Sequence, residues 1–167
     1  MSVFVSFEGP EGSGKTTQLQ ALRRYLEARG LPVYAPREPG GTRISDLVRS
    51  IVLNPEHTEM KPQTEILLFS AARAQLVGQE IQPRLERGEI VLSDRYADST
   101  LAYQGYGLGL DLDTLRAITR FATGGLVPDL TFCLNVPVRA GLTRKRGQDA
   151  AEWNRMEQRE LDYHERV

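Results

Sequence analysis

A glycine-rich segment near the start of the chain constrains its fold more than any other feature. Residues 9–16 have the sequence GPEGSGKT, which fits the pattern G-x-x-x-x-G-K-[ST]. An apolar, β-rich run over 3–7 precedes this segment, and Leu19, Leu22 and Leu26 follow it at helical spacing. The segment is therefore predicted to be the loop that joins a strand to a helix.

A loop with this composition and context binds phosphate. Its glycines allow successive backbone N–H groups to surround phosphate oxygens, and the next helix adds the partial positive charge of its N-terminus. Lys15 is expected to reach the β and γ phosphates, and Thr16 to ligate Mg²⁺. The predicted ligand is a nucleoside triphosphate. The residues predicted to bind it are Gly9, Pro10, Glu11, Gly12, Ser13, Gly14, Lys15, Thr16 and Thr17.

The rest of the chain alternates short apolar runs with helical patterns. Strands are expected over 32–37, 89–93 and 129–136. Helices are expected over 44–51, over 64–85 with a bend at Pro83, over 112–121, from Pro137 onward and over 153–167. This alternation predicts a parallel sheet, whose ligands gather at the carboxyl ends of the strands. Asp94 and Arg95 stand at such an end.

The composition is that of one soluble globular domain of 167 residues. Lys plus Arg number 21 and Asp plus Glu 22, so the whole molecule has no positive field to attract nucleic acid or an anionic membrane. The apolar start is too short for a signal peptide or a membrane span, and a cytoplasmic location is expected. Cys133, the only cysteine, lies in an apolar run and is expected to be a buried, inert thiol.

The loop pattern alone leaves the phosphate acceptor open, because ATPases, GTPases and small-molecule kinases share it. A GTPase would need an N-K-x-D guanine signature, which the sequence lacks. An oligomeric ATPase would usually place a second acid after Asp94, where Arg95 stands instead. Both of these classes are therefore disfavoured.

Four segments then point to one family: FEGPEGSGKTTQ (7–18), REPGGT (37–42), LLFSAAR (67–73) and DRYADSTLAYQG (94–105). In their order and spacing the sequence resembles bacterial thymidylate kinases, which are nucleoside monophosphate kinases with a phosphate-binding loop. The resemblance implies an α/β fold in three layers, a parallel sheet with helices on both faces. It also implies one kinase domain over 1–167 with a short lid at about 142–154. Family members normally continue through a further strand and helix, which are expected to be missing from this sequence.

The resemblance also implies an activity. The family transfers the γ-phosphoryl group of ATP to dTMP with Mg²⁺, usually as a homodimer. Thr16, from the loop pattern, and Asp94, from its place at the end of a buried strand, are the expected metal residues; Asp94 would either hold a water of the metal or instead orient a neighbouring cation. Two alternatives stay open, another monophosphate kinase and a nucleotide-binding protein without turnover.

Residues implied to bind dTMP are Glu11, Glu38, Arg49, Phe69, Arg73, Arg95, Ser99, Thr100, Tyr103 and Gln104. Phe69 matches a ring that stacks on thymine, Arg73 a base contact and Gln104 a contact to the pyrimidine edge. Tyr103 matches a ring that crowds a ribose 2′-hydroxyl, and Arg95 matches the arginine that grips the acceptor phosphate. Without the resemblance, the simpler interpretations of Phe69 and Arg73 are a core aromatic and a solvated helix charge.

The implied catalytic residues are Lys15, Asp94, Arg95 and Arg146. Some relatives carry an arginine in the loop where this chain has Gly12, whereas the bacterial type uses arginines of the lid. Arg144, Lys145 and Arg146 stand in that lid. Arg146 is the predicted lid residue and Arg144 the alternative. An arginine at Gly12 is expected to substitute in part for the lid.

Overall fold

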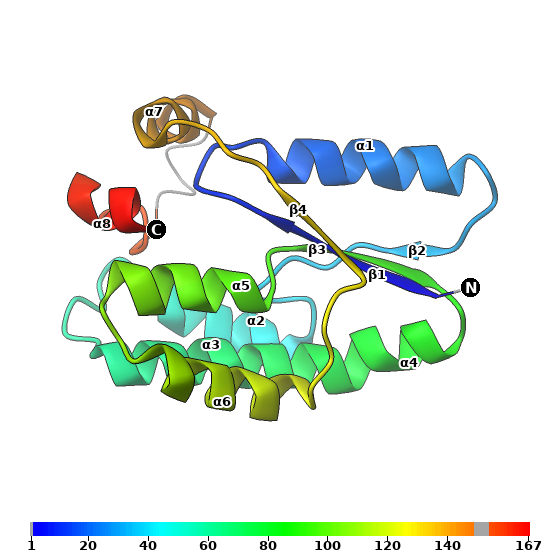
Figure 1. Ribbon diagram of the computed structural model, residues 1–167, viewed down its shortest axis with the longest axis horizontal. Helices are drawn as coiled ribbons and strands as arrows, with labels where there is room; N and C mark the ends of the chain where they lie inside the picture. The colour runs from blue at the N-terminus through cyan, green and yellow to red at the C-terminus, as the bar shows by residue number, and fades with distance from the viewer. Residues whose placement is uncertain (1, 149–153) are drawn as a thin grey trace.

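Four parallel strands form one sheet in the computed structural model, which describes residues 2–148 and 154–167 (Figure 1). The order across the sheet is β2-β3-β1-β4. The strands are β1 Val3–Glu8, β2 Val33–Tyr34, β3 Ile90–Asp94 and β4 Leu130–Cys133. Central β1 pairs with β3 on one side and with β4 on the other. Its carboxyl end leads directly into the glycine-rich loop.

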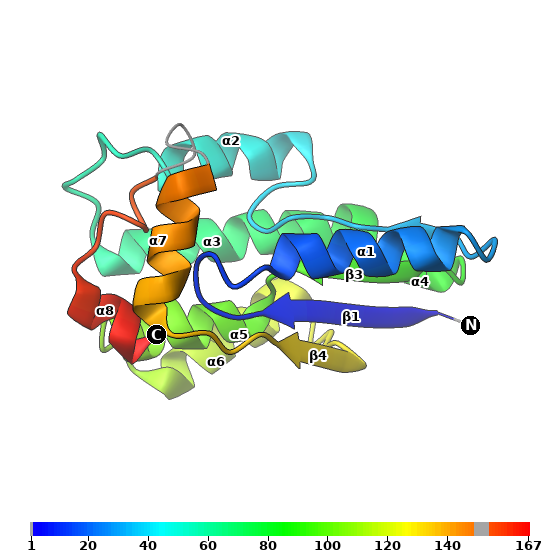
Figure 2. The same cartoon turned by 90° about the horizontal axis from the view of Figure 1, so that it is seen from above.

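Helices cover both faces of the sheet, as the resemblance implies. Figure 1 shows α1 on one face and α3, α4 and α6 on the other. The described α-helices are α1 Lys15–Glu27, α2 Arg43–Val52, α3 Pro62–Leu76, α4 Gln82–Glu86, α5 Ala97–Thr100, α6 Leu112–Thr123, α7 Val138–Gln148 and α8 Leu161–Arg166. Two π-helical segments are η1 Val77–Ile81 and η2 Leu101–Gly107. In Figure 2, α7 stands beside the loop between β1 and α1.

The alternation of side chains along β1 divides the core into two layers. Val5 and Phe7 pack with Leu19 of α1 on one face. Phe4 points to the opposite face and packs there with Leu76 and other buried residues of the α3–α4 segment. Successive side chains of a strand point to opposite faces, so apolar residues on both sides of β1 require helices on both faces.

The long helix predicted over 64–85 is present but changes its hydrogen-bond pattern before Pro83. It continues from α3 through η1 into α4. Pro83 has no N–H to donate to the carbonyl four residues earlier, and the wider π turns at Val77–Ile81 directly precede it. The break therefore falls earlier than the bend expected at the proline itself.

Three local predictions need correction. The strand predicted over 32–37 is shorter, with only an isolated bridge from Arg37 to Asp94 beyond β2. Cys133 is exposed rather than buried, because β4 lies at the edge of the sheet and all of its residues are exposed. The helix predicted over 153–167 is limited to α8.

Tertiary contacts explain why the helix predicted over 153–167 is limited to α8. Trp153 lies outside the described residues, and residues 155–158 form turns. Met156 of this segment is buried, and the side chains of Arg155 and Arg159 reach the carboxylate of Glu65. These contacts outweigh the local helical preference. Of the predicted lid, residues 149–153 lie outside the described part of the chain.

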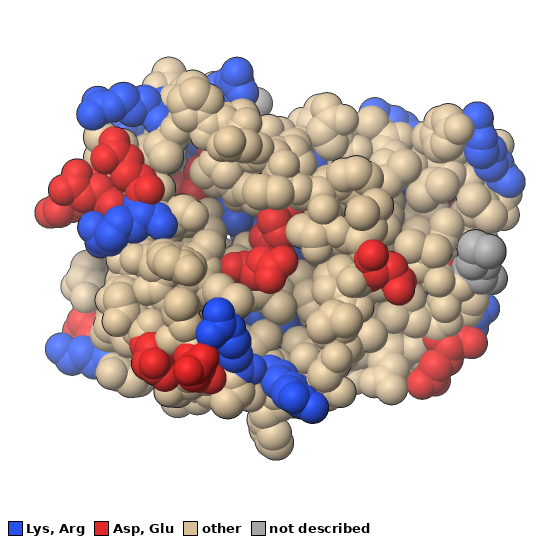
Figure 3. Space-filling view, viewed as in Figure 1, with Lys and Arg blue, Asp and Glu red and all other residues tan. Residues whose placement is uncertain are grey.

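One face of the molecule carries side chains of both charges. On the face drawn in Figure 3, acidic and basic side chains are interspersed. No helix within 2–148 or 154–167 is both long and apolar enough to cross a membrane.

Candidate active site

The site lies where β1 and β3 end. The chain crosses one face of the sheet after β1 and the other face after β3, so a crevice is left between their carboxyl ends. A cavity of about 470 Å³ occupies this position. It is lined by every residue implied to bind dTMP and by the loop from Glu11 to Thr17. Gly9 and Pro10 are not among its lining residues.

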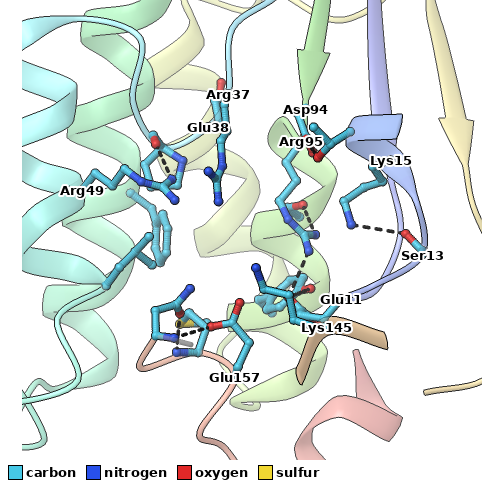
Figure 4. Close-up of a pocket in the computed structure, with 18 of the residues that line it drawn as sticks. Glu11, Ser13, Lys15, Arg37, Glu38, Arg49, Asp94, Arg95, Lys145 and Glu157 are labelled. Atoms are coloured by element: carbon cyan, nitrogen blue, oxygen red, sulfur yellow. Dashed lines mark hydrogen bonds and ion pairs between the residues drawn. The ribbon is translucent and has the colours of Figure 1, made fainter. Parts of the chain in front are cut away.

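Six cations from six different segments line this cavity, one of which is Arg73 of α3. Figure 4 shows the other five around the same space, namely Lys15, Arg37, Arg49, Arg95 and Lys145. With a net charge of −1, the molecule as a whole does not attract anions, so this local cluster is what makes the cavity suitable for phosphate groups.

Lys15 begins α1 directly after Gly14, whose φ of 93° lies in the left-handed region. Its Nζ donates hydrogen bonds to the carbonyl oxygens of Gly9 and Pro10, at 3.0 and 2.8 Å. Burial and the nearby Arg95 guanidinium lower the pKa of Lys15 to about 8. The ammonium group is thus held inside the loop, where phosphate oxygens could replace the carbonyls as its partners.

The loop also packs directly against the start of α7. A Cβ atom placed on Gly12 would collide with the carbonyl oxygen of Gly141, and one on Gly141 would collide with the carbonyl oxygen of Glu11. Gly12 also has a φ of 63°. The expectation that an arginine at Gly12 could substitute for the lid is therefore wrong for this conformation, because backbone atoms occupy the space of any side chain.

Asp94 and Arg95 extend from the end of β3 toward the loop. Thr16 Oγ1 donates a hydrogen bond of 2.5 Å to Asp94 Oδ2. Arg95 has a φ of 73°, which is rare for a residue with a side chain. This backbone conformation directs the guanidinium at the loop, where it donates to Gly9 O and Glu11 Oε1, both at 3.0 Å. The strained turn thus positions the cation.

Glu11 is a buried carboxylate with two differently used oxygens. Its Oε1 accepts from Arg95 and, at 2.5 Å, from the Tyr103 hydroxyl. Burial alone would raise its pKa, but Arg95, the Tyr103 hydrogen bond and Lys15 together lower it. Its Oε2 accepts no hydrogen bond from the described residues and lies 3.7 Å from His164 Nδ1. This second oxygen is suited to accept a hydrogen bond from a ligand hydroxyl.

Arg73 is buried, so its interpretation as a solvated helix charge is wrong. Its Nε donates to Glu38 Oε2 at 2.6 Å, and its two other nitrogens donate to Thr100 Oγ1 and Tyr96 O. Burial raises the pKa of Glu38 even though the neighbouring guanidinium opposes this. A guanidinium has five N–H donors, so Arg73 keeps two for a ligand in the cavity.

The remaining predicted residues are also brought to the cavity. Phe69 is half-buried and lines its wall. Arg49 Nη1 donates to Pro39 O at 2.7 Å. The Ser99 hydroxyl donates to Glu8 Oε2 at 2.6 Å, so Glu8 supports the residue that Arg95 also contacts.

The lid cations separate in the structure. Lys145 lines the cavity, whereas Arg144 and Arg146 are exposed on α7 and are not among the lining residues. The geometry thus favours Lys145 as the lid cation that acts on the phosphates, whereas the sequence favours Arg146 for this role. Side chains three or four places apart share a helix face, and neighbouring residues do not.

Sequence reasoning missed several residues of the site. Asn154, Met156 and Glu157 close one side of the cavity, and Arg37 closes another. Behind this wall, Arg155 and Arg159 meet Glu65. The only signal in the sequence is the alternation of charges in RMEQRE, which is also typical of a charged helix.

Comparison with known proteins agrees with this geometry. The family model described as thymidylate kinase matches residues 7–167. The chain is 62% identical over 177 residues to a protein named thymidylate kinase from Roseiflexus sp. (strain RS-1), covering 100% of this chain and 78% of that protein. It is 57% identical over 190 residues to a protein named thymidylate kinase from Herpetosiphon aurantiacus, covering 100% of this chain and 80% of that protein.

A solved structure leads to the same family. The crystal structure of thymidylate kinase from Ehrlichia chaffeensis matches with a TM-score of 0.76 and 37% sequence identity, over 87% of this chain and 78% of that one. The family match extends over nearly the whole chain and includes the loop, the end of β3 and the cavity walls. The chain therefore belongs to the thymidylate kinase family.

Proposed function

We propose that this chain transfers the γ-phosphoryl group of ATP to dTMP, producing dTDP and ADP. One observation carries the proposal. A single cavity in a member of the thymidylate kinase family joins the phosphate-binding loop to all residues implied to bind dTMP. Another monophosphate kinase or a nucleotide-binding protein without turnover is less well supported, because relatives named thymidylate kinase match the whole chain.

The chemistry requires alignment and charge compensation. The second pKa of a phosphate monoester is about 6, so the acceptor is ionised at neutral pH and needs no general base. The difficulty is to bring two polyanions together. Lys15 faces the β and γ phosphates from the loop, and Arg95 grips the acceptor phosphate from the end of β3. Between them they offset the negative charge that develops on the transferred group.

The residues present fit Mg²⁺. A hydroxyl and a carboxylate, Thr16 and Asp94, lie in hydrogen-bond contact at the edge of the phosphate loop. Among the described residues, no group of three or more His, Cys, Asp or Glu could hold a metal ion by itself. Mg²⁺ bound with nucleotide typically takes one or two protein ligands, with phosphate oxygens and waters as the rest. When bound, the ion neutralises charge on the β and γ oxygens.

The opposite wall of the cavity suits the nucleoside. Phe69 offers a ring face for thymine, and Arg73 keeps N–H donors for the base. Gln104 lines the same wall at the pyrimidine edge. Tyr103 and Glu11 are placed for the sugar, the first by its ring and the second by its free oxygen.

A coupled assay of ADP release tests the proposal. The purified chain is supplied with ATP, Mg²⁺ and, in separate reactions, dTMP, dUMP, UMP, CMP or AMP. We expect dTMP to give the highest kcat/KM. ADP release without any dependence on an acceptor would contradict the proposal, and so would a preference for another monophosphate.

Tyr103 is expected to select the deoxyribose. Changing Tyr103→Leu removes a buried ring, so the ratio of kcat/KM for dTMP to that for ribothymidine monophosphate should fall about tenfold. Tyr103→Phe is the matched control, because it keeps the ring and loses only the hydrogen bond to Glu11. If the ratio is unchanged in the leucine variant, Tyr103 has a packing role alone.

The lid cations are expected to act on the transferring phosphoryl group. Lys145→Ala should lower kcat about 10²-fold while leaving the Kd of dTMP nearly unchanged, because Lys145 is the lid cation that lines the cavity and its contact belongs to the transition state. Arg146→Ala and Arg144→Ala, the two changes that the sequence points to, are measured in parallel. Near-normal kcat in all three variants would show that the lid cations are a solvated surface.

We also propose that the chain forms a homodimer and acts in the cytoplasm. Ile44, Leu47 and Ile51 lie three and four places apart on α2, and each is about half exposed. Leu67 of α3, the helix against which α2 packs, is exposed as well. A second copy of the chain would remove this apolar stripe from water. The substrates ATP and dTMP support the cytoplasmic location.

A further inference from the structure

A buried carboxylate lies behind the wall of the cavity that faces the base. Glu65, in the first turn of α3, has 1% of its surface exposed. Its Oε2 accepts hydrogen bonds from Arg155 Nη2 and Arg159 Nη2, both at 2.6 Å. Its Oε1 accepts from Gln104 Nε2 at 2.8 Å. Each oxygen of the carboxylate therefore has its own set of donors.

This arrangement determines which end of the Gln104 amide faces Glu65. A carboxylate with two arginines on one oxygen can only accept on the other. Gln104 must therefore turn its NH₂ group toward Glu65. Gln104 also lines the cavity, with 2% of its surface exposed. The opposite end of its amide, the carbonyl oxygen, is the end left for a ligand.

The direction of this amide has a consequence for base selection. Thymine and uracil carry an N–H at ring position 3, which a carbonyl oxygen can accept. Cytosine carries an unprotonated nitrogen there, which would face the carbonyl oxygen with no proton between them. A buried polar group that is left without its partner lowers binding strongly, so an oriented amide discriminates between these bases.

We propose that Glu65 is a positioning residue for base specificity, which holds Gln104 so that the site accepts a pyrimidine with a proton on N3. The proposal deepens the proposed function and rests on it. Arg155 and Arg159 contribute to this positioning, because they occupy Oε2 of Glu65 and leave its Oε1 for Gln104. Arg155 is itself fixed by donating from Nε to Val52 O at 3.0 Å.

The isosteric change Glu65→Gln tests the direction of the amide. The two arginines can only donate, so the new side chain must give them its oxygen and turn its NH₂ toward Gln104. Gln104 must then reverse and present its own NH₂ to the cavity. We expect the ratio of kcat/KM for dTMP to that for dCMP to fall at least about tenfold, mainly through the KM of dTMP. The Kd of ATP should stay unchanged.

A double variant separates orientation from structural damage. In Glu65→Gln with Gln104→Glu the two side chains exchange places. The NH₂ of the glutamine introduced at position 65 can donate to one oxygen of the carboxylate at position 104, whose other oxygen again accepts from N3–H. We expect the preference for dTMP to return. Glu86→Gln, an exposed change on α4, is the matched control for the loss of one charge.

The outcomes are distinguishable. A wild-type chain that does not prefer dTMP over dCMP contradicts the proposed function itself. A wild-type preference that survives unchanged in a folded Glu65→Gln variant, checked by thermal unfolding, overturns the positioning role alone. A lost preference that the exchanged pair does not restore overturns it as well. If the single variant does not fold, the preference of the exchanged pair decides.

Discussion

A Lys15→Ala variant should keep its fold and lose turnover by about 10³-fold or more. The fold should persist because the loop depends on glycine backbone conformations and on the N-terminus of α1, which alanine preserves. Turnover should collapse because the Lys15 ammonium is the cation that the loop itself brings to the phosphates. The measurement is kcat by coupled ADP release, together with a thermal unfolding curve.

Lys61→Ala provides the control for this experiment. Lys61 is exposed at the start of α3 and is one of only three lysines in the chain. Its loss should leave kcat close to that of the wild type. Turnover of the Lys15 variant at the wild-type rate would contradict the assignment of the loop to catalysis.

An Arg95→Gly variant is expected to lose at least about 10³-fold in kcat/KM for dTMP. Glycine is chosen because Arg95 has a φ of 73°, which glycine adopts without strain, so the loss reports on the side chain. The missing guanidinium would deprive the acceptor phosphate of a forked cation. It would also remove an ion pair from the buried Glu11.

Arg95→Lys separates charge from shape. Lysine keeps the positive charge but cannot make two parallel hydrogen bonds, so its kcat/KM should lie between the values of the wild type and the glycine variant. Steady-state kinetics with varied dTMP at saturating ATP measure kcat/KM for the lysine variant and for the glycine variant. If the glycine variant changed only the Kd of ATP, Arg95 would belong to the nucleotide side of the cavity.

Local pattern was sufficient for much of the fold. The strand, loop and helix around residues 3–27 agree with prediction, as do β3 and α6 within a few residues. These elements carry their own signals, namely periodic apolar residues and glycines where φ is positive. The family was also visible in four short segments, because each combines several residues that line the same cavity.

Local pattern misjudged elements whose conformation depends on distant partners. Residues 154–159 have the charge pattern of a solvated helix, yet Arg155 and Arg159 turn inward to Glu65, about ninety residues away in the chain. Cys133 stands in an apolar run, yet its strand lies at the edge of the sheet. Glu65 is far from Arg155 and Arg159 in the sequence, and the position of β4 in the sheet depends on the other strands. The residues around these segments therefore give no local signal of either feature.

The sequence by itself determined that a phosphate-binding loop follows a strand, that Asp94 and Arg95 end another, and that the family is that of thymidylate kinases. Only the tertiary structure decided how those parts interact. It packed Gly12 against Gly141, which leaves no space for a side chain, and it placed Lys145 rather than Arg146 at the cavity. Loop and strand signals are local, so a sequence contains them. Contacts between segments depend on how the sheet and helices pack, and hydrogen-bond direction and free volume are set only there.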